Sequence, residues 1–208
     1  GLFSTIFSDN EIHNAALFDE NCIIDLSRVG SAETKSLLMG ILFMRLQEHR
    51  MAYTKGMNVP LKHVTVLEEA HHLLRKTSMT QSSEGANLQG KSVETLTNAI
   101  AEMRTYGEGF IIADQSPNLL DTSVVRNTNT KIIMRLPDGS DRQEVGASAS
   151  LNDEQLDEIS KLETGVAIIY QNNWLEPVLC KVHRNTNELP LIAEDSRICL
   201  LYTSDAAD

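Results

Sequence analysis

The sequence is poor in features that would place a protein outside the cell or in a membrane. It has only three cysteines, Cys22, Cys180 and Cys199, and their odd number and wide spacing argue against a disulfide framework or a zinc site. No apolar run approaches the ~20 residues that a transmembrane helix needs. The first residues lack the basic start and long apolar centre of a signal peptide. We therefore expect a globular protein in a reducing, cytoplasmic setting, with enough chain for one good core.

Positive charge is also scarce. The chain has 18 Lys and Arg residues against 29 Asp and Glu residues, which gives a formal net charge of −11. Such a balance does not favour nonspecific binding of nucleic acid over the whole surface. It is compatible with a local basic path, because Arg75, Lys76 and Lys91 bracket one polar segment.

The most informative segment that is present lies at residues 63–69, with the sequence His-Val-Thr-Val-Leu-Glu-Glu. The apolar, β-branched run predicts a buried strand that ends in two adjacent carboxylates. In a nucleotide hydrolase, such a pair faces Mg²⁺ on a triphosphate, as in a Walker B element. Glu68 would then approach Mg²⁺, directly or through water, and Glu69 would orient and deprotonate the attacking water. The alternative is that one Glu caps the following helix and the other is solvated.

Strands and helices alternate along the chain. We expect strands at residues 21–26, 63–67, 109–113, 131–136, 166–170 and 177–182, and helices at 31–49, 92–106, 119–126 and 152–162, with a short helix through residues 73–74. Residues 77–89 are polar and predict a loop. This order predicts an α/β fold with a mostly parallel sheet, helices on both faces and a C-terminal β-hairpin. Ligands bind at the carboxyl ends of such strands, where we expect Asp25, Glu68–Glu69 and Asp114–Gln115 to form one site.

Two further polar residues fit a nucleotide site. Gln115 follows a predicted strand, where a side-chain amide can sense a γ-phosphate; the alternative is an ordinary turn residue before Pro117. Arg104 lies near the end of a predicted amphipathic helix and off its apolar stripe. An arginine at a subunit edge can reach a neighbour's nucleotide and neutralise transition-state charge. The alternative is a surface cation that is favoured near a helix C-terminus.

Four motifs together resemble the C-terminal half of the ATPase domain in HerA-type ATPases, which group with the FtsK-like hexameric DNA pumps. In chain order the motifs are Leu67-Glu-Glu-Ala-His71, Ile100-Ala-Glu-Met-Arg-Thr-Tyr-Gly107, Asp114-Gln-Ser-Pro117 and Asn127-Thr-Asn-Thr-Lys131. The resemblance covers about residues 17–183. It implies a RecA-like P-loop NTPase core with Walker B acids at Glu68 and Glu69, an arginine finger at Arg104 and a sensor glutamine at Gln115. Glu68 stands where Asp is commonest in Walker B elements.

The same resemblance implies how such a protein works. ATP and Mg²⁺ are its cofactors, and a homo-oligomeric, hexameric ring translocates on double-stranded DNA, with a nuclease as partner in end processing or phage defence. The Walker A loop of the family lies upstream of the segment that this chain spans, so we expect the chain alone to be poorly active. Alternatives are a conjugation or secretion ATPase of the same superfamily, or an assembly subunit that binds nucleotide without turnover.

A phosphate-loop pattern also occurs, but in an unexpected place. Residues from Gly85 to Ser92 match G-x-x-x-x-G-K-[ST]. The segment follows the Walker B strand and has no apolar strand before it, so we favour a polar loop facing a central pore, where Arg75, Lys76 and Lys91 would contact DNA phosphates. An NTPase that uses this segment as a genuine phosphate loop is the alternative. His71 and His72 do not suggest a metallohydrolase, because no third ligand is evident.

The chain ends in a segment of unusual sequence. We expect residues 1–190 to be the C-terminal portion of an ATPase domain and residues 191–208 to be a tail. Residues 199–208 resemble a translated sequencing adapter, which would make the source a truncated read; the alternative is a natural tail.

Overall fold

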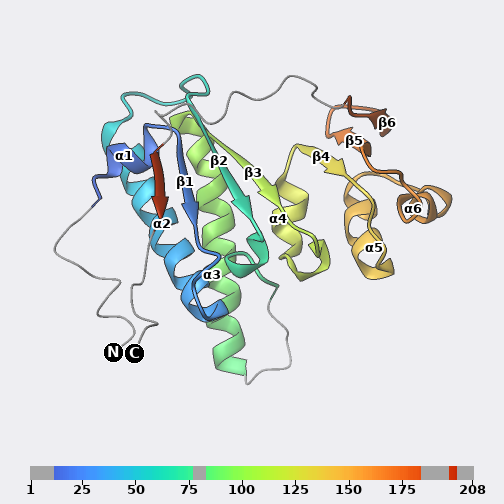
Figure 1. The fold of residues 1–208 in the computed structure, drawn as a ribbon, viewed down its shortest axis with the longest axis horizontal. Helices are drawn as coiled ribbons and strands as arrows, with labels where there is room; N and C mark the ends of the chain where they lie inside the picture. Colours follow the sequence, from blue (N-terminus) through green and yellow to red (C-terminus); the bar gives the residue numbers. More distant parts are fainter. Residues whose placement is uncertain (1–11, 77–82, 184–196, 201–208) are drawn as a thin grey trace. The chain divides into compact units, whose positions relative to one another are not determined.

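The computed structural model describes residues 12–76, 83–183 and 197–200, and its contacts group into two units (Figure 1). The described part of the first unit comprises residues 12–64, 103–109 and 197–200. The second comprises residues 65–76, 83–102 and 110–183. In neither unit do the described residues form a helix that is both long and apolar enough to cross a membrane.

The first unit contains helices α1 (Asn14–Phe18) and α2 (Ala32–Tyr53) and strands β1 (Cys22–Asp25) and β7 (Arg197–Leu200). Helix α2 starts where the sequence predicts, because the Ser31 side chain accepts a hydrogen bond from the Thr34 backbone N–H. Its buried side includes Leu38, Phe43 and Leu46. Strand β1 pairs in parallel with β7, from Cys22 opposite Arg197 to Asp25 opposite Leu200. Cys199 and Leu200 thus form the end of β7, and the origin of residues 199–208 stays a prediction.

Strands β2 (His63–Glu68) and β3 (Glu108–Ala113) form a two-stranded sheet and run in the same direction (Figure 1). Each begins in the first unit and ends in the second. Strand β2 leads into the 3₁₀-helix η1 (Ala70–His72), and β3 leads into η3 (Pro117–Leu119). Both strands were predicted, but the expected burial of the first is wrong, because Val64 and Val66 of β2 are 41% and 56% exposed. The short helix expected through residues 73–74 is a single 3₁₀ turn at residues 70–72.

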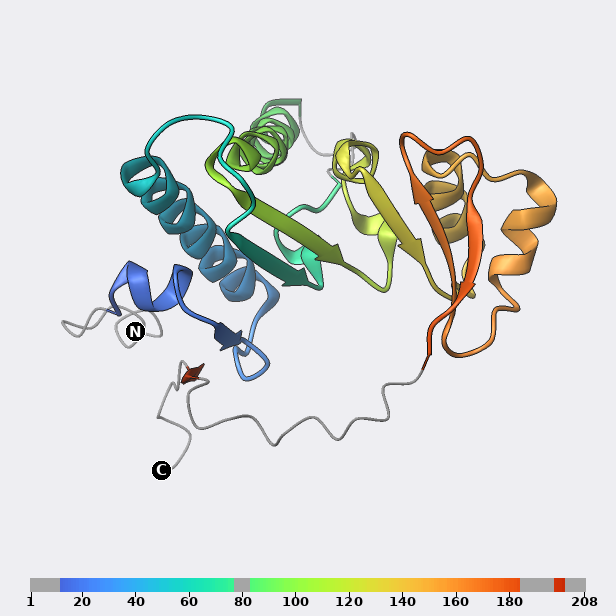
Figure 2. The ribbon, with the colours of Figure 1, turned by 90° about the horizontal axis from the view of Figure 1, so that it is seen from above.

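The remaining elements of the second unit are α3 (Ser83–Met103), whose last residue belongs to the first unit, α4 (Thr122–Asn127), β4 (Thr130–Ile133), α5 (Gly139–Ser148), α6 (Asp153–Ile159), β5 (Val166–Gln171) and β6 (Val178–Lys181). Figure 2 shows α3 and α4 on the same side of β2 and β3. The predicted hairpin is present as β5 and β6. Strand β4 is also antiparallel to β5, so these strands form a separate sheet over a core of Ile133, Ala149, Ile159, Leu162 and Ile168.

Two helical segments of this unit differ from expectation. Helix α5 was missed because its sequence has little apolar periodicity; it is started by Asp138, whose carboxylate accepts from the Ser140 and Asp141 backbone N–H groups. Residues 83–89, expected in a loop, belong to α3, and residues 77–82 of that loop lie outside the described chain. Glutamate, alanine, leucine and glutamine in this stretch are strong helix formers, and their propensity outweighs the cost of the one glycine, Gly85.

Candidate functional site

The acidic pair lies at the carboxyl end of β2, as the sequence predicts. Glu68 is the last residue of the strand, and both acids are exposed. Glu69 adopts a left-handed backbone conformation with φ 48° and ψ 47°, which is uncommon for a residue other than glycine. Its carboxylate lies 3.4 Å from Nε2 of His72. Unusual backbone conformations of this kind cluster at functional sites, where the surrounding structure holds them.

Asp114 connects the turn after β2 with the turn after β3. Its Oδ2 accepts a hydrogen bond of 2.8 Å from the His71 backbone N–H and lies 2.9 Å from His71 Nδ1. Its Oδ1 accepts a bond of 2.9 Å from the Ser116 backbone N–H. With its side chain only 2% exposed, this carboxylate has both oxygens bonded in a site from which water is excluded. The bonds fix His71, two residues after Glu69, against the residue before Gln115.

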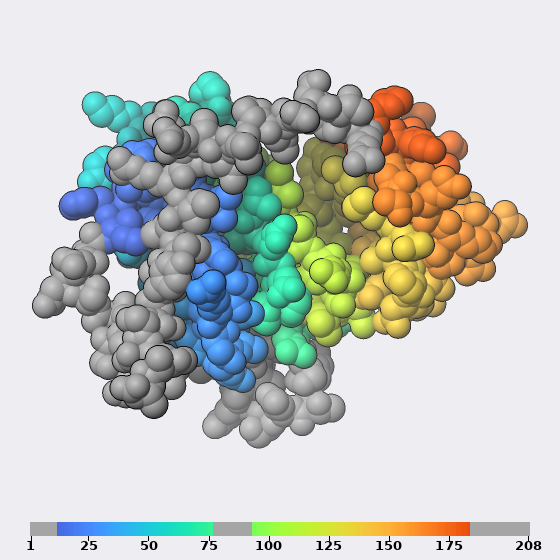
Figure 3. Space-filling model, in the orientation of Figure 1, coloured from blue at the N-terminus to red at the C-terminus, as the bar shows by residue number. Residues whose placement is uncertain are grey.

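Backbone bonds extend the contact between the two turns. The Asp121 N–H donates to the Leu74 carbonyl at 2.9 Å, and the Lys76 N–H donates to the Leu119 carbonyl at 2.8 Å. Leu74 is fully buried. In Figure 3 the turquoise segment after β2 and the yellow-green segment after β3 adjoin on one face. The structure therefore places the segments that contain Glu68, Glu69 and Gln115 at one end of the two strands, with Gln115 exposed.

Two other predicted site residues belong to the first unit. Asp25 ends β1, and its Oδ1 accepts a bond of 2.8 Å from the Ser27 backbone N–H. Hydrogen bonds from the Ser27 backbone and hydroxyl hold the pKa of Asp25 below its usual value. Arg104 begins the 3₁₀-helix η2 (Arg104–Tyr106) and is exposed. The expected convergence of Asp25 with the acidic pair stays a prediction, and so does the role of Arg104 as a finger on a neighbouring subunit's nucleotide.

The phosphate-loop pattern from Gly85 to Ser92 lies wholly within α3. A phosphate loop wraps its anion with backbone N–H groups that precede a helix. In α3 only the first four N–H groups, up to residue 86, are without an intrahelical acceptor, and the rest of the pattern is committed to helix bonds. The polar loop expected here is wrong over residues 83–92, which are helical, and the place of this segment at a central pore stays a prediction. Arg75 lies at a bridge to Leu120, and Lys76 Nζ lies 3.8 Å from Glu144. Lys91 belongs to a part of α3 whose side chains are not described.

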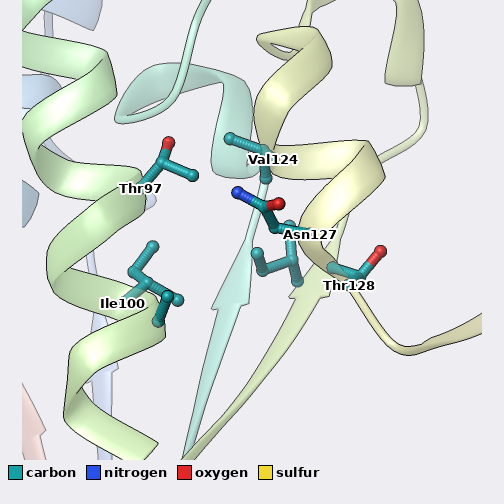
Figure 4. Close-up of a pocket in the computed structure, with 7 residues that line it drawn as sticks. Thr97, Ile100, Val124, Asn127 and Thr128 are labelled. Atoms are coloured by element: carbon teal, nitrogen blue, oxygen red, sulfur yellow. The ribbon is translucent and has the colours of Figure 1, made fainter.

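A small cavity lies among α3, β3 and α4 (Figure 4). Its volume is about 50 Å³, far below the roughly 300 Å³ at which small-molecule pockets begin. It is lined by Thr97, Ile100, Ala101, Ile112, Val124, Asn127 and Thr128. The cavity is thus a packing defect between elements, too small for a nucleotide.

The bond between Asp114 and His71 was not foreseen, although Asp114 was expected at a strand end. We predict that Asp114→Asn lowers the free energy of unfolding of the second unit by about 1.5–3 kcal/mol, because it removes the charge from hydrogen bonds in a dry site. Chemical denaturation followed by circular dichroism measures this effect. Asp157→Asn changes an exposed carboxylate on α6 and should shift stability by less than about 0.5 kcal/mol. Equal effects of the two substitutions would contradict the prediction.

Comparison with known proteins places this geometry in a family context. No protein-family model matches the chain. The chain is 31% identical over 144 residues to the DNA double-strand break repair helicase HerA of Sulfolobus acidocaldarius, covering 69% of the chain and 27% of that protein. It is 24% identical over 185 residues to a probable helicase of Methanocaldococcus jannaschii, covering 86% of the chain and 34% of that protein. The chain therefore spans about a third or less of the length of these curated relatives.

Solved structures confirm the fold. The genome packaging NTPase B204 of Sulfolobus turreted icosahedral virus 2, in complex with ATP-gammaS, matches with a TM-score of 0.55 at 14% identity, over 88% of this chain and 76% of that one. VirB4 of Thermoanaerobacter pseudethanolicus matches with a TM-score of 0.55 at 12% identity, over 76% of this chain and 40% of that one. At such identities the likeness shows the fold alone, which is that of a P-loop NTPase with a C-terminal antiparallel hairpin.

Proposed function

We propose that this chain, which belongs to the HerA-type ATPases of the FtsK/HerA superfamily, forms part of the ATP-hydrolysing site of a DNA-translocating motor. The observation that supports the proposal most directly is the Asp114 bridge, which holds the acidic turn after β2 beside the turn that contains Gln115. Two polar strand ends that lie side by side at the carboxyl edge of a parallel sheet are where α/β proteins bind ligands. The strand order alone would not require the turn after β2 and the turn after β3 to be bonded to each other.

The acidic pair suits a magnesium site of the kind that nucleotide hydrolases use. Mg²⁺ prefers oxygen ligands and is commonly held by one or two carboxylates together with substrate phosphates and water. Glu68 and Glu69 are exposed carboxylates at the strand end, and Glu68 would hold the ion directly or through water. The ion would neutralise charge on the triphosphate. Glu69 would position the attacking water and accept its proton, while Gln115 would contact the γ-phosphate.

The remaining parts of the proposed motor lie partly outside the acidic site. Arg104 would act as a finger on the nucleotide of a neighbouring subunit in a hexameric ring. Arg75, Lys76 and Lys91 would contact the phosphates of double-stranded DNA. The names of the relatives, which are DNA double-strand break repair helicases, support the DNA substrate. We infer a cytoplasmic protein that works with a nuclease in end processing or phage defence.

A conjugation or secretion ATPase is the second candidate, since VirB4 has the same fold. The two functions differ in what stimulates hydrolysis. We predict that linear double-stranded DNA raises ATP turnover of the whole gene product at least fivefold, and that a streptavidin roadblock on the DNA reduces the gain. Turnover is measured by phosphate release. If the rate of ATP hydrolysis is unchanged by DNA of every length but increases with membrane vesicles, the secretion function is supported and the DNA motor is contradicted.

A further inference from the structure

A second group of charged side chains lies away from the acidic turn, in the first unit. Glu108, the first residue of β3, has a side chain with 0% exposure. Its Oε2 accepts a hydrogen bond of 2.8 Å from Arg50 Nε, and its Oε1 lies 2.8 Å from His63 Nδ1. The proposed ATPase site uses none of these three residues. They join helix α2, the start of β2 and the start of β3 around one buried carboxylate.

Arg50 extends this cluster to a fourth segment. Its Nη1 donates to Asp19 Oδ1 at 2.6 Å, and its Nη2 donates to the Phe18 carbonyl at the end of α1. His49 Nε2 lies 2.8 Å from the other oxygen of Asp19. Burial raises the pKa of Asp19, but the bonds from Arg50 and with His49 outweigh burial and leave that pKa below its usual value. One guanidinium thereby fixes the position of Glu108 relative to both helices.

The backbone immediately before Glu108 is fixed as well. Gly107 ends η2 in a left-handed conformation with φ 81°, and its carbonyl accepts a bond of 2.8 Å from the Lys62 N–H. The Thr105 carbonyl accepts a bond of 3.2 Å from the Val59 N–H. A Cβ at position 107 would lie 2.6 Å from the Pro60 carbonyl oxygen, so only glycine fits. The turn that begins with Arg104 is therefore held at its C-terminal end by backbone hydrogen bonds and by the side-chain bonds of Glu108.

Burying the ion pair of Arg50 and Glu108 costs free energy of desolvation. Burying a charge requires full pairing, and a well-packed apolar group of similar size is often as stable or more stable. What a buried ion pair adds is directional geometry, because the planar guanidinium meets a carboxylate in few orientations. An arginine finger acts only when its guanidinium reaches a defined point. The Arg104 side chain is long and exposed, so the position of its backbone determines the region that its guanidinium can occupy.

We propose that Glu108, held by Arg50 and His63, is a positioning residue that fixes the Arg104 turn so that Arg104 can reach a neighbouring subunit's nucleotide. The inference rests on the proposed function, because a positioning role for Glu108 requires that Arg104 acts as an arginine finger. Glu108 itself touches no substrate. Loss of its charge should loosen the turn and leave the acidic site of the same subunit complete.

The kinetic test uses Glu108→Gln in the whole gene product, beside Arg104→Ala and the control Glu158→Gln, which removes an exposed carboxylate paired with Lys161. We expect Glu108→Gln to lower kcat at least tenfold with KM for ATP changed less than twofold, and the control to match the parent. Adding Glu69→Gln subunits, whose fingers are intact, should restore part of the turnover. Arg50→Lys should reproduce the kcat loss if Glu108→Gln does not fold.

A second measurement on the chain itself does not depend on ATP. Hydrogen exchange followed by mass spectrometry should show peptides covering residues 57–63 and 103–108 exchanging at least tenfold faster in Glu108→Gln, with the acidic turn at 68–74 unchanged. Unchanged exchange in the first two peptides, or a kcat equal to the parent's while Arg104→Ala is impaired, overturns the positioning role alone. If Arg104→Ala keeps parental turnover, the finger fails and the positioning role fails with it.

Discussion

Replacing Glu69 by glutamine is expected to lower the ATP turnover of the whole gene product by about 10²- to 10⁴-fold, the usual contribution of a general base. Glutamine matches the size of glutamate and can occupy the same left-handed turn, so the fold should survive. Nucleotide affinity should change little, because Glu69 is proposed to act on the attacking water. Single-turnover phosphate release measures the chemical step, and a fluorescent ATP analogue measures binding.

Glu163→Gln is a matched control for this substitution. Glu163 is exposed in the same unit and lies 3.9 Å from Lys181, so its loss should leave turnover within about twofold of the parent, as for most exposed residues. A Glu69→Gln protein that hydrolyses ATP as fast as the parent would remove Glu69 from the role of base. Weak binding with normal single-turnover chemistry would instead assign Glu69 to holding the nucleotide.

The ends of β2 and β3 could be predicted because local signals agree there. Each strand is an apolar run that stops at a polar residue, and parallel strands present their carboxyl ends at the same edge. The bond that joins the two ends could not be predicted, since Asp114 and His71 are 43 positions apart and the signal is one acid among many. The same holds for Arg50 and Glu108, which are 58 positions apart.

The errors in the helices have a different cause. Polarity was used as evidence of a loop before α3, yet a helix with a solvent-facing surface needs only good helix formers. Helix α5 depends on the Asp138 cap and on packing of Val145 and Gly146 against residues near α6, which sequence periodicity does not report. The antiparallel pairing of β4 is determined by tertiary packing, and the order of strands and helices along the chain does not predict it.

Arg104→Ala is expected to reduce turnover of the assembled protein by about 10³-fold or more, as for other arginine fingers. Removing the guanidinium takes away positive charge that would stabilise the transition state, whereas ground-state binding depends on other residues. The affinity for an ATP analogue should therefore stay within about threefold of the parent. The matched control is Arg126→Ala, which removes an exposed arginine from the last turn of α4 and should be nearly silent.

Mixing Arg104→Ala with Glu69→Gln subunits tests whether the finger acts between subunits. Each variant alone lacks one essential group, but a mixed ring contains interfaces where an intact Glu69 faces an intact Arg104. With random assembly at equal amounts, about one interface in four should regain both groups, because each of the two positions is filled correctly half of the time. Phosphate release should therefore rise well above that of either variant and peak near equal mixing. A flat response at every ratio, in rings shown by mass photometry to exchange subunits, would place Arg104 outside the neighbour's site.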